Sequence, residues 1–358
     1  MLYQLLYGLH ESISAFNVFR YITFRTFLSI MTALFISFVL TPYVIKKFNH
    51  WRIKSGKRED VPERHNSKRD TPTMGGSVIL ISTIIPTLLW ADLGNKYVWI
   101  VIVALLLFGF IGFIDDFRKL KNQNGKGIKG NTKFLLQVVS AIVISVYIYF
   151  GTDFNTSLSV PFFKNFTPDL GLLYILLSVF IIVGASNSVN LTDGLDGLAI
   201  GPVLSVCGTF MLFAYLVGHV KFANYLQIFY VRGAGELAIL CGAMLGAGIG
   251  FLWYNAYPAE LFMGDTGSLS LGAALGVIAI LIKQEILLVI TGGIFVAETL
   301  SVIIQVLSYK WKKKRIFKMA PIHHHFELKG WSEEKIVVRF WIISVILALI
   351  ALSTLKLR

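Results

Sequence analysis

The stretch YVWIVIVALLLFGFIGFIDDFRKLK, residues 97–121, decides the fold class of this chain. Its first part, residues 97–114, contains no charged side chain. An α-helix needs about 20 apolar residues to cross a bilayer, and this run approaches that length. Two adjacent carboxylates, Asp115 and Asp116, end the apolar run. The stretch therefore predicts a membrane-spanning helix with an acidic end at one face of the membrane.

The composition extends this prediction to the whole chain. Of the 358 residues, 55% are hydrophobic and 15% are charged, whereas soluble domains carry about 25% charged residues. The mean hydropathy is +0.69. These values exclude a disordered chain, a collagen-like chain and an ordinary cytosolic enzyme. Cys207 and Cys241 lie inside apolar runs, so neither a disulfide framework nor a thiolate metal site is expected.

Ten apolar segments predict an all-α, polytopic integral membrane protein with about ten transmembrane helices and a single domain over residues 1–358. The first 20 residues carry several charged and polar side chains, which favours an interfacial helix over a cleavable signal peptide. The predicted spans begin near Phe24, Gly75, Tyr97, Phe134, Gly171, Leu198, Glu236, Ser268, Ile286 and Ile336.

The distribution of Lys and Arg predicts the orientation. Three loops, about residues 46–74, 115–133 and 308–335, hold 23 of the 33 basic residues and fall on one side. That side is predicted to be cytoplasmic, with both termini periplasmic. The loops 187–197 and 254–267 fall on the same side and carry Asp and Asn but no Lys or Arg. In so apolar a chain, the net charge of +13 indicates an anionic membrane surface or anionic substrates, not nucleic acid.

The acidic residues of these loops are the first candidates for chemistry. The carboxylates of Asp115 and Asp116 repel each other beside hydrocarbon, and a bound divalent cation usually offsets such repulsion. Lys119 would share their helix face, so a solvated helix end with an ion pair is the alternative. Asp265 precedes the eighth span, where a carboxylate could also simply cap the helix.

Further candidates for ligand binding lie in the two loops without basic residues. In NSVNLTDGLDG, residues 187–197, Gly194 and Gly197 allow a ligand to approach the backbone, although a polar connecting turn is the alternative. Phe262 could stack on a nucleobase or could be an ordinary interface aromatic. In the loop 187–197, the polar side chains that are candidates for binding are Asn187, Asn190, Asp193 and Asp196.

The basic loops offer groups for phosphate. In the loop 46–74, Lys68 and Thr73 could hold a diphosphate, or the loop could serve only as a positive-inside anchor. The string PIHHHF contains His323, His324 and His325, which could act as acids, bases or donors to phosphate; a solvated polar stretch is the alternative. Consecutive residues do not share a helix face, so a three-histidine zinc site is not expected.

Three further features of the last third of the chain bear on function. The run KWKKKRIFK, residues 310–318, is typical of an amphipathic interfacial segment. Glu298 lies in the middle of a predicted span, where we expect a hydrogen bond in helix packing. Gln305, nearer the cytoplasmic end of that span, is the better candidate for a ligand cavity. Together, the five loops favour phosphoryl transfer at the membrane surface with Mg²⁺ on the phosphate oxygens.

Four strings, GFIDD, NLTDGLDGLA, FMGDTGSLSLG and APIHHHFE, occur in this order. They resemble the polyprenyl-phosphate N-acetylhexosamine-1-phosphate transferase superfamily, and the HHH string resembles its phospho-N-acetylmuramoyl-pentapeptide branch. The resemblance implies transfer of phospho-MurNAc-pentapeptide from UDP-MurNAc-pentapeptide to undecaprenyl phosphate, which gives lipid I and UMP for peptidoglycan synthesis. It also implies ten transmembrane helices, a Mg²⁺ site, a homodimer and a place in the bacterial inner membrane.

The resemblance also implies roles for individual residues. Asp265 would be the chief metal ligand, with Asp115 and Asp116 beside it on metal or on the lipid phosphate. His323, His324 and His325 would sit at the sugar and diphosphate end, and His323 would be the catalytic one. The residues implied in nucleotide and phosphate binding are Asp193, Asp196, Asn255, Phe262, Lys68, Lys119 and Lys133.

Two mechanisms and three rival functions stay open at this point. The lipid phosphate could attack directly, or Asp116 could form a covalent phospho-enzyme. Direct attack is favoured because a lipid phosphate is already mostly ionised near neutral pH. The rival functions are a UDP-GlcNAc:undecaprenyl-phosphate GlcNAc-1-phosphate transferase, a transporter and a membrane scaffold. The PIHHHFE string favours the muramoyl branch over the first.

Overall fold

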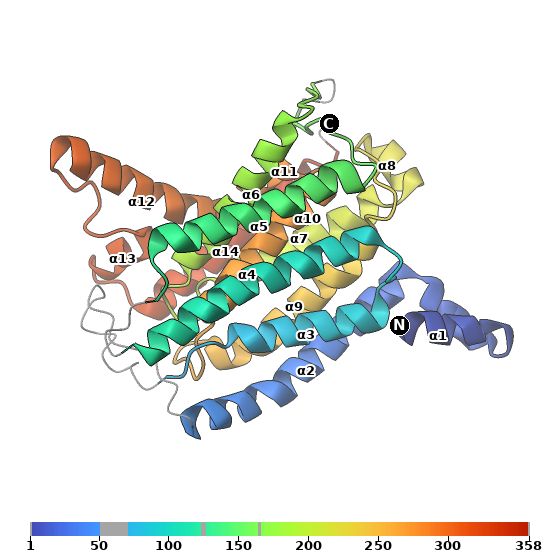
Figure 1. Cartoon of the computed structure of the whole chain (residues 1–358), viewed down its shortest axis with the longest axis horizontal. Coiled ribbons are helices and arrows are strands. Elements are labelled where there is room, and N and C mark those ends of the chain that lie inside the picture. Colours follow the sequence, from blue (N-terminus) through green and yellow to red (C-terminus); the bar gives the residue numbers. More distant parts are fainter. Residues whose placement is uncertain (1, 51–70, 123–126, 164–165, 357–358) are drawn as a thin grey trace.

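A computed structural model describes residues 2–50, 71–122, 127–163 and 166–356. Within these ranges the chain is a bundle of helices without a β-strand (Figure 1), which confirms the predicted all-α class. The helices are α1 (Leu2–Gly8), α2 (Ile22–His50), α3 (Gly76–Trp90), α4 (Lys96–Lys121), α5 (Gly130–Gly151), α6 (Leu173–Thr192), α7 (Ile200–Val217), α8 (Val220–Leu226), α9 (Glu236–Asn255), α10 (Gly264–Leu281), α11 (Glu285–Thr291), α12 (Gly293–Lys312), α13 (Ile322–Glu327) and α14 (Glu333–Ser353).

Nine helices in the described part of the chain are long and apolar enough to cross a membrane, namely α2, α4, α5, α6, α7, α9, α10, α12 and α14. The tenth predicted span corresponds to α3, which has 15 residues and is about 22 Å long. A bilayer core is about 30 Å thick, so α3 alone is short for a full crossing. The polytopic class is thus confirmed, while the periplasmic placement of both termini stays a prediction.

Two segments differ in detail from the sequence prediction. Residues 2–20 form α1 and two short 3₁₀ helices, Leu9–Glu11 and Ser14–Arg20, instead of one interfacial helix. The ninth predicted span is broken at Gly292, where α11 ends and α12 begins. Beyond this break, the C-terminal half of α12 projects away from the bundle (Figure 1).

Helix α10 forms the centre of the bundle, because nearly all of its side chains are buried. Two glycines allow its neighbours to reach its backbone. A Cβ atom at Gly112 of α4 would lie 2.2 Å from the carbonyl oxygen of Asp265. A Cβ atom at Gly76 of α3 would lie 2.0 Å from the amide nitrogen of Gly267. These close approaches hold the first turn of α10 against α3 and α4.

Candidate active site

The structure brings the three predicted carboxylates together. Asp115 and Asp116 lie near the C-terminal end of α4, and Asp265 lies in the first turn of α10. One oxygen from each side chain can be chosen so that all three lie within 4.8 Å of one another. Asp115 and Asp116 are buried and Asp265 is mostly buried. Clustered carboxylate oxygens of this kind are the ligands that a hard divalent cation prefers.

Asp116 holds the first turn of α10 in place. Its Oδ1 accepts a hydrogen bond from the backbone N–H of Asp265 at 3.1 Å. Its Oδ2 accepts from the backbone N–H of Thr266 at 2.9 Å and from the Thr266 hydroxyl at 2.7 Å. A carboxylate at a helix N-terminus is also favoured by the helix dipole. Both oxygens of Asp116 are therefore engaged, and they fix the position of Asp265.

Two lysines neutralise most of the negative charge of the cluster. Lys119 Nζ lies 2.7 Å from Asp115 Oδ2 and 3.0 Å from Asp265 Oδ2. Lys133, from the first turn of α5, forms an ion pair with Asp265 and lies 3.6 Å from Asp115 Oδ2. The N–H of Ile128 donates to Asp115 Oδ1 at 2.6 Å. Three carboxylates and two ammonium groups leave one formal negative charge in excess, which suits a bound cation.

Asn190 joins this cluster, whereas Asn187 contacts other residues. The amide of Asn190 donates to Asp265 Oδ1 at 3.0 Å and to Ser268 Oγ at 2.8 Å. The amide of Asn187 donates to Gln137 Oε1 at 2.7 Å and to its own helix at the carbonyl oxygen of Val183. Asn190 thus orients Asp265, while Asn187 ties α6 to α5.

Asp196 and Asn255 hold two loops of the site together. Asp196 Oδ2 accepts from the N–H of Ala259 at 3.0 Å. Asn255 Oδ1 accepts from the N–H of Gly197 at 3.1 Å, and its amide donates to the carbonyl oxygen of Leu261 at 2.9 Å. These contacts join the segment after α6 to the segment before α10. Both side chains are buried, so the structure gives them a positioning role.

The remaining predicted loop residues lie around this frame. Asp193 ends α6 and is partly buried. Phe262 is partly buried, and its N–H donates to the carbonyl oxygen of Pro72 at 2.9 Å. Thr73 lies beside Gly264, since a Cβ atom there would be 3.0 Å from Thr73 Oγ1. Lys68 lies outside the described residues.

His323 pairs with Glu298, a contact that the sequence did not reveal. His323 Nδ1 lies 3.1 Å from Glu298 Oε1, and both side chains are almost completely buried. We expected Glu298 to bond in helix packing, but its partner is this site histidine on α13. The predicted loop 187–197 begins with the last turns of α6, which runs to Thr192. His323 meets the turn after α6, because a Cβ atom at Gly194 would lie 2.3 Å from His323 Nε2. Within the described chain, His323 Nε2 has no hydrogen-bond partner.

The other two histidines point to different partners. His324 Nδ1 lies 2.6 Å from Glu327 Oε2. His325 Nδ1 accepts from the backbone N–H of Lys318 at 3.1 Å. Burial lowers the pKa of His325, and the ammonium groups of Lys329 and Lys318 lower it further. The three histidines thus contact different parts of the chain.

Gln305 is engaged with the backbone near the end of α12. Its Oε1 accepts from the N–H groups of Ile316 and Phe317, both at 3.0 Å. Its Nε2 donates to the carbonyl oxygen of Phe317 at 2.9 Å. These three bonds clamp the chain after α12, so the amide faces backbone groups where we expected a ligand cavity.

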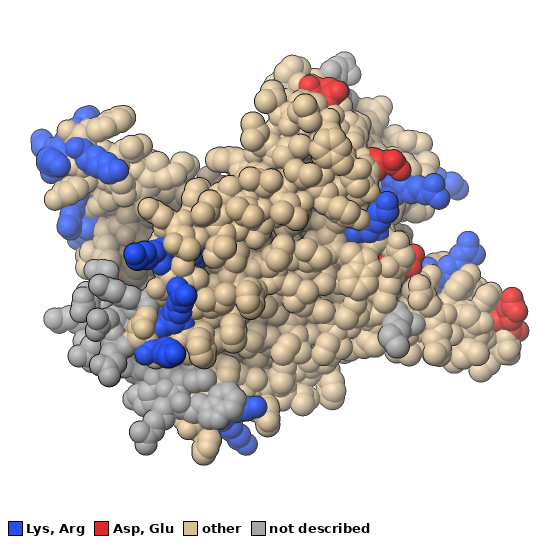
Figure 2. Space-filling view, viewed as in Figure 1, with Lys and Arg blue, Asp and Glu red and all other residues tan. Residues whose placement is uncertain are grey.

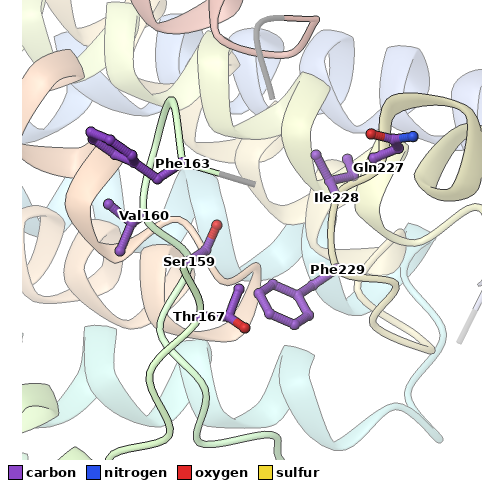
Figure 3. A pocket seen from close by; sticks show the side chains of 7 residues that line it. All are labelled: Ser159, Val160, Phe163, Thr167, Gln227, Ile228 and Phe229. Atoms are coloured by element: carbon purple, nitrogen blue, oxygen red, sulfur yellow. The ribbon is translucent and has the colours of Figure 1, made fainter. Parts of the chain in front are cut away.

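Two hollows are lined by residues other than the three carboxylates. One, of about 330 Å³, lies between α2, α3 and α4 and is lined by Phe48, Met74, Ser77, Phe113, Phe117, Leu120 and Lys121. The other, of about 230 Å³, lies between the segment that joins α5 to α6 and the segment after α8 (Figure 3). It is lined by Ser159, Val160, Phe163, Thr167, Gln227, Ile228 and Phe229. Neither hollow is lined by a residue predicted for the site.

The comparisons with known proteins agree with this geometry. Residues 98–283 match the model of glycosyl transferase family 4. The fold and the acidic site therefore define a polytopic membrane protein of that transferase class.

Relatives over the full chain narrow the class. The chain is 59% identical to the phospho-N-acetylmuramoyl-pentapeptide-transferase of Syntrophus aciditrophicus (strain SB), over 100% of both chains. It is 58% identical to that of Pelobacter propionicus (strain DSM 2379 / NBRC 103807 / OttBd1) and 56% identical to that of Geobacter sp. (strain M21), again over the full length of each. The chain belongs to the phospho-N-acetylmuramoyl-pentapeptide-transferase family.

Proposed function

We propose that this protein transfers phospho-MurNAc-pentapeptide from UDP-MurNAc-pentapeptide to undecaprenyl phosphate, with lipid I and UMP as products. We place it in the bacterial inner membrane, with the site at the cytoplasmic face and with a homodimer as the assembly. The observation that carries the proposal is the meeting of three carboxylates and two lysines at one end of the bundle. Membership of the family supplies the substrate class.

The residues present suit Mg²⁺ as cofactor. Asp265 and Asp115 would hold the ion, because each presents an oxygen toward the centre of the cluster, where both lysines now lie. Asp116 would orient Asp265, since its own oxygens are bonded to the start of α10. When bound, the ion would neutralise charge on the diphosphate and on the departing UMP.

The lysines give the site its affinity for phosphate. Lys119 and Lys133 lie within reach of the carboxylates and therefore at the place where the diphosphate would approach them. Their ammonium groups would pair with phosphate oxygens and stabilise the charge that develops in phosphoryl transfer. His323 Nε2 lies beside Gly194, and Glu298 holds the ring through Nδ1, so Nε2 is the ring atom that would meet the sugar phosphate.

Direct attack is the mechanism that this geometry favours. An oxygen of the lipid phosphate would attack the phosphorus attached to the sugar, and the bond from that phosphorus to the UMP oxygen would break. A covalent phospho-enzyme on Asp116 would need a free carboxylate oxygen. Asp116 instead accepts three hydrogen bonds from Asp265 and Thr266, and transfer to it would break at least one of them.

UMP release tests the proposal. Purified full-length protein would receive undecaprenyl phosphate with either UDP-MurNAc-pentapeptide or UDP-GlcNAc, each with Mg²⁺ and with chelator. We expect metal-dependent release with the muramoyl donor alone, and loss of release in Asp265→Asn. Release with UDP-GlcNAc alone would move the protein to the alternative GlcNAc-1-phosphate transferase function. No release from folded protein with either donor would overturn the proposal.

A further inference from the structure

The end of α12 and the turn after it form a strongly basic projection, which we call the basic tip and define as residues 309–318. It contains six cations and no carboxylate, and no Asp or Glu occurs between Glu298 and Glu327. All six cations are exposed. Figure 2 shows blue side chains gathered at this projecting end, away from the red ones. The cations are Lys310, Lys312, Lys313, Lys314, Arg315 and Lys318.

The stem below the basic tip indicates its depth in the membrane. Residues 300–307 of α12 expose aliphatic side chains on several sides, among them Leu300, Ile303 and Val306. A helix with apolar side chains on all its faces is typical of a segment surrounded by lipid hydrocarbon. The aromatic residues Tyr309 and Trp311 come next, and Trp311 is 80% exposed. Lys310 lies between them, and the other five cations follow. This order of aliphatic, aromatic and basic residues matches the layers of a bilayer from core to headgroups.

We propose that the basic tip is a docking surface for the headgroups of anionic phospholipids in the cytoplasmic leaflet. Charge complementarity carries the choice of partner, because each Lys or Arg near an anionic leaflet adds to the attraction. The apolar stem favours a lipid over a soluble polyanion, since it places the cations at the bilayer surface. Among the described residues, none of the six cations forms an ion pair that would already neutralise it.

Hydrogen bonds link the basic tip to α13, the short helix that contains the three histidines. Gln305 clamps the backbone of residues 316 and 317, and Ser308 Oγ donates to the carbonyl oxygen of Lys314 at 2.8 Å. Lys318 then donates from its N–H to His325 and from its Nζ to the carbonyl oxygen of Leu328 at 2.9 Å. Lipid that holds the basic tip would therefore also hold α13. The effect on turnover, unlike the binding itself, rests on the proposed function.

Binding is tested without turnover. Trp311→Cys would carry an environment-sensitive thiol fluorophore, and the native Cys207 and Cys241 are buried. The detergent-solubilised full chain would be titrated with short-chain phosphatidylglycerol and, separately, with phosphatidylcholine of equal chain length. We expect tighter binding of phosphatidylglycerol. In the same labelled background, Lys312→Gln/Lys314→Gln is expected to weaken the binding of phosphatidylglycerol about thirtyfold. Each cation contributes about 1 kcal/mol, and about 1.4 kcal/mol corresponds to a tenfold change in affinity.

A matched control removes the same charge elsewhere. Lys46→Gln/Lys47→Gln lies at the end of α2 and is expected to leave the affinity within about twofold of the starting chain. Equal affinity for both lipids, equal loss in the control, or displacement of the lipid by free pyrophosphate would each overturn the proposal.

Turnover gives a second and separate readout. In nanodiscs, we expect phosphatidylglycerol to raise UMP release by the unaltered chain but not by Lys312→Gln/Lys314→Gln. Lipid binding without any UMP release in any chain would overturn the proposed function and leave the docking surface standing. Equal stimulation of both chains by phosphatidylglycerol would overturn the link from the basic tip to α13.

Discussion

Replacement of Gly264 by Ala tests whether Asp116 positions the first turn of α10, which holds Asp265, the residue proposed to bind the metal. Gly264 begins α10 with φ +70°, in the left-handed region that only glycine adopts without cost. An added Cβ atom would lie 2.7 Å from Asp116 Oδ2 and 3.0 Å from Thr73 Oγ1. The first distance is too short for a carbon–oxygen contact, so the carboxylate of Asp116 would have to move.

The cost has two parts that other glycines can separate. The left-handed conformation costs a residue with a Cβ atom about 1–2 kcal/mol. A moved Asp116 also loses at least one hydrogen bond to Thr266, and bonds to charged groups are worth about 1.5–3 kcal/mol each. We therefore expect Gly264→Ala to lower the free energy of unfolding by about 3–5 kcal/mol.

Two control variants isolate these parts. Gly330 has φ +92° and no atom within 4 Å of an added Cβ, so Gly330→Ala should show only the backbone cost of about 1–2 kcal/mol. Gly184, inside α6, has neither problem, and Gly184→Ala should lose no stability. Unfolding in detergent would be followed by heat and by denaturant for all three variants.

UMP release completes this test. Displacement of a catalytic group by about 1 Å can cost a factor on the order of 100 in rate, so Gly264→Ala should lose activity that both controls keep. Equal destabilisation of Gly264→Ala and Gly330→Ala, with UMP release by the first within about twofold of the unaltered chain, would refute the reasoning.

Three further predictions follow from the contacts of the site. Lys133→Met removes the ammonium group that pairs with Asp265 and should raise the KM for the UDP substrate. An unchanged KM would contradict a role of Lys133 in phosphate binding. Glu298→Gln keeps a hydrogen-bond acceptor for His323 and should be milder in UMP release than Glu298→Leu, which leaves a buried nitrogen unpaired at a cost of about 1–3 kcal/mol; equal effects would contradict the pairing. The pKa of His325 is lowered in the folded chain from its ordinary value of 6.5, so the unfolded chain binds a proton first as the pH falls. The contribution of His325 to stability should therefore be complete above pH 6.5 and should decline between pH 6.5 and the lower folded-state pKa. Melting temperatures across this range would check it, and an equal decline in His325→Asn would assign the effect to other groups.

The sequence predicts the membrane helices well, because length and apolarity alone determine whether a segment can span a bilayer. The exceptions have physical reasons. The run that contains α3 is apolar enough, but Trp90 ends the helix after 15 residues. The ninth span looks continuous in hydropathy, yet Gly292 breaks it into α11 and α12. Hydropathy reports apolarity and does not report where a backbone ladder is interrupted.

The acidic motifs also predict which residues gather at the site, but not what each of them does. Three carboxylates at helix ends on one side can converge, and they do. That Asp116 serves the backbone of α10 depends on Gly264 and on the close approach of α4, which are tertiary facts. Glu298 was the harder case, since its partner His323 lies 25 residues away across an irregular turn. The available signal was its charge in the middle of an apolar helix.

The pairing of charges explains how a site at the edge of a membrane could accept a highly charged donor. In the present structure each lysine of the site lies against Asp115 and Asp265, so no ammonium group is buried alone. An unpaired charge at such a depth would be costly. A diphosphate that arrives with its cation would give the lysines phosphate oxygens in exchange for carboxylates, and would give the carboxylates the cation. Both states are then paired throughout, so the binding energy is not consumed by the separation of charges. This exchange requires acids and lysines in one cluster, which is the arrangement that α4, α5 and α10 build.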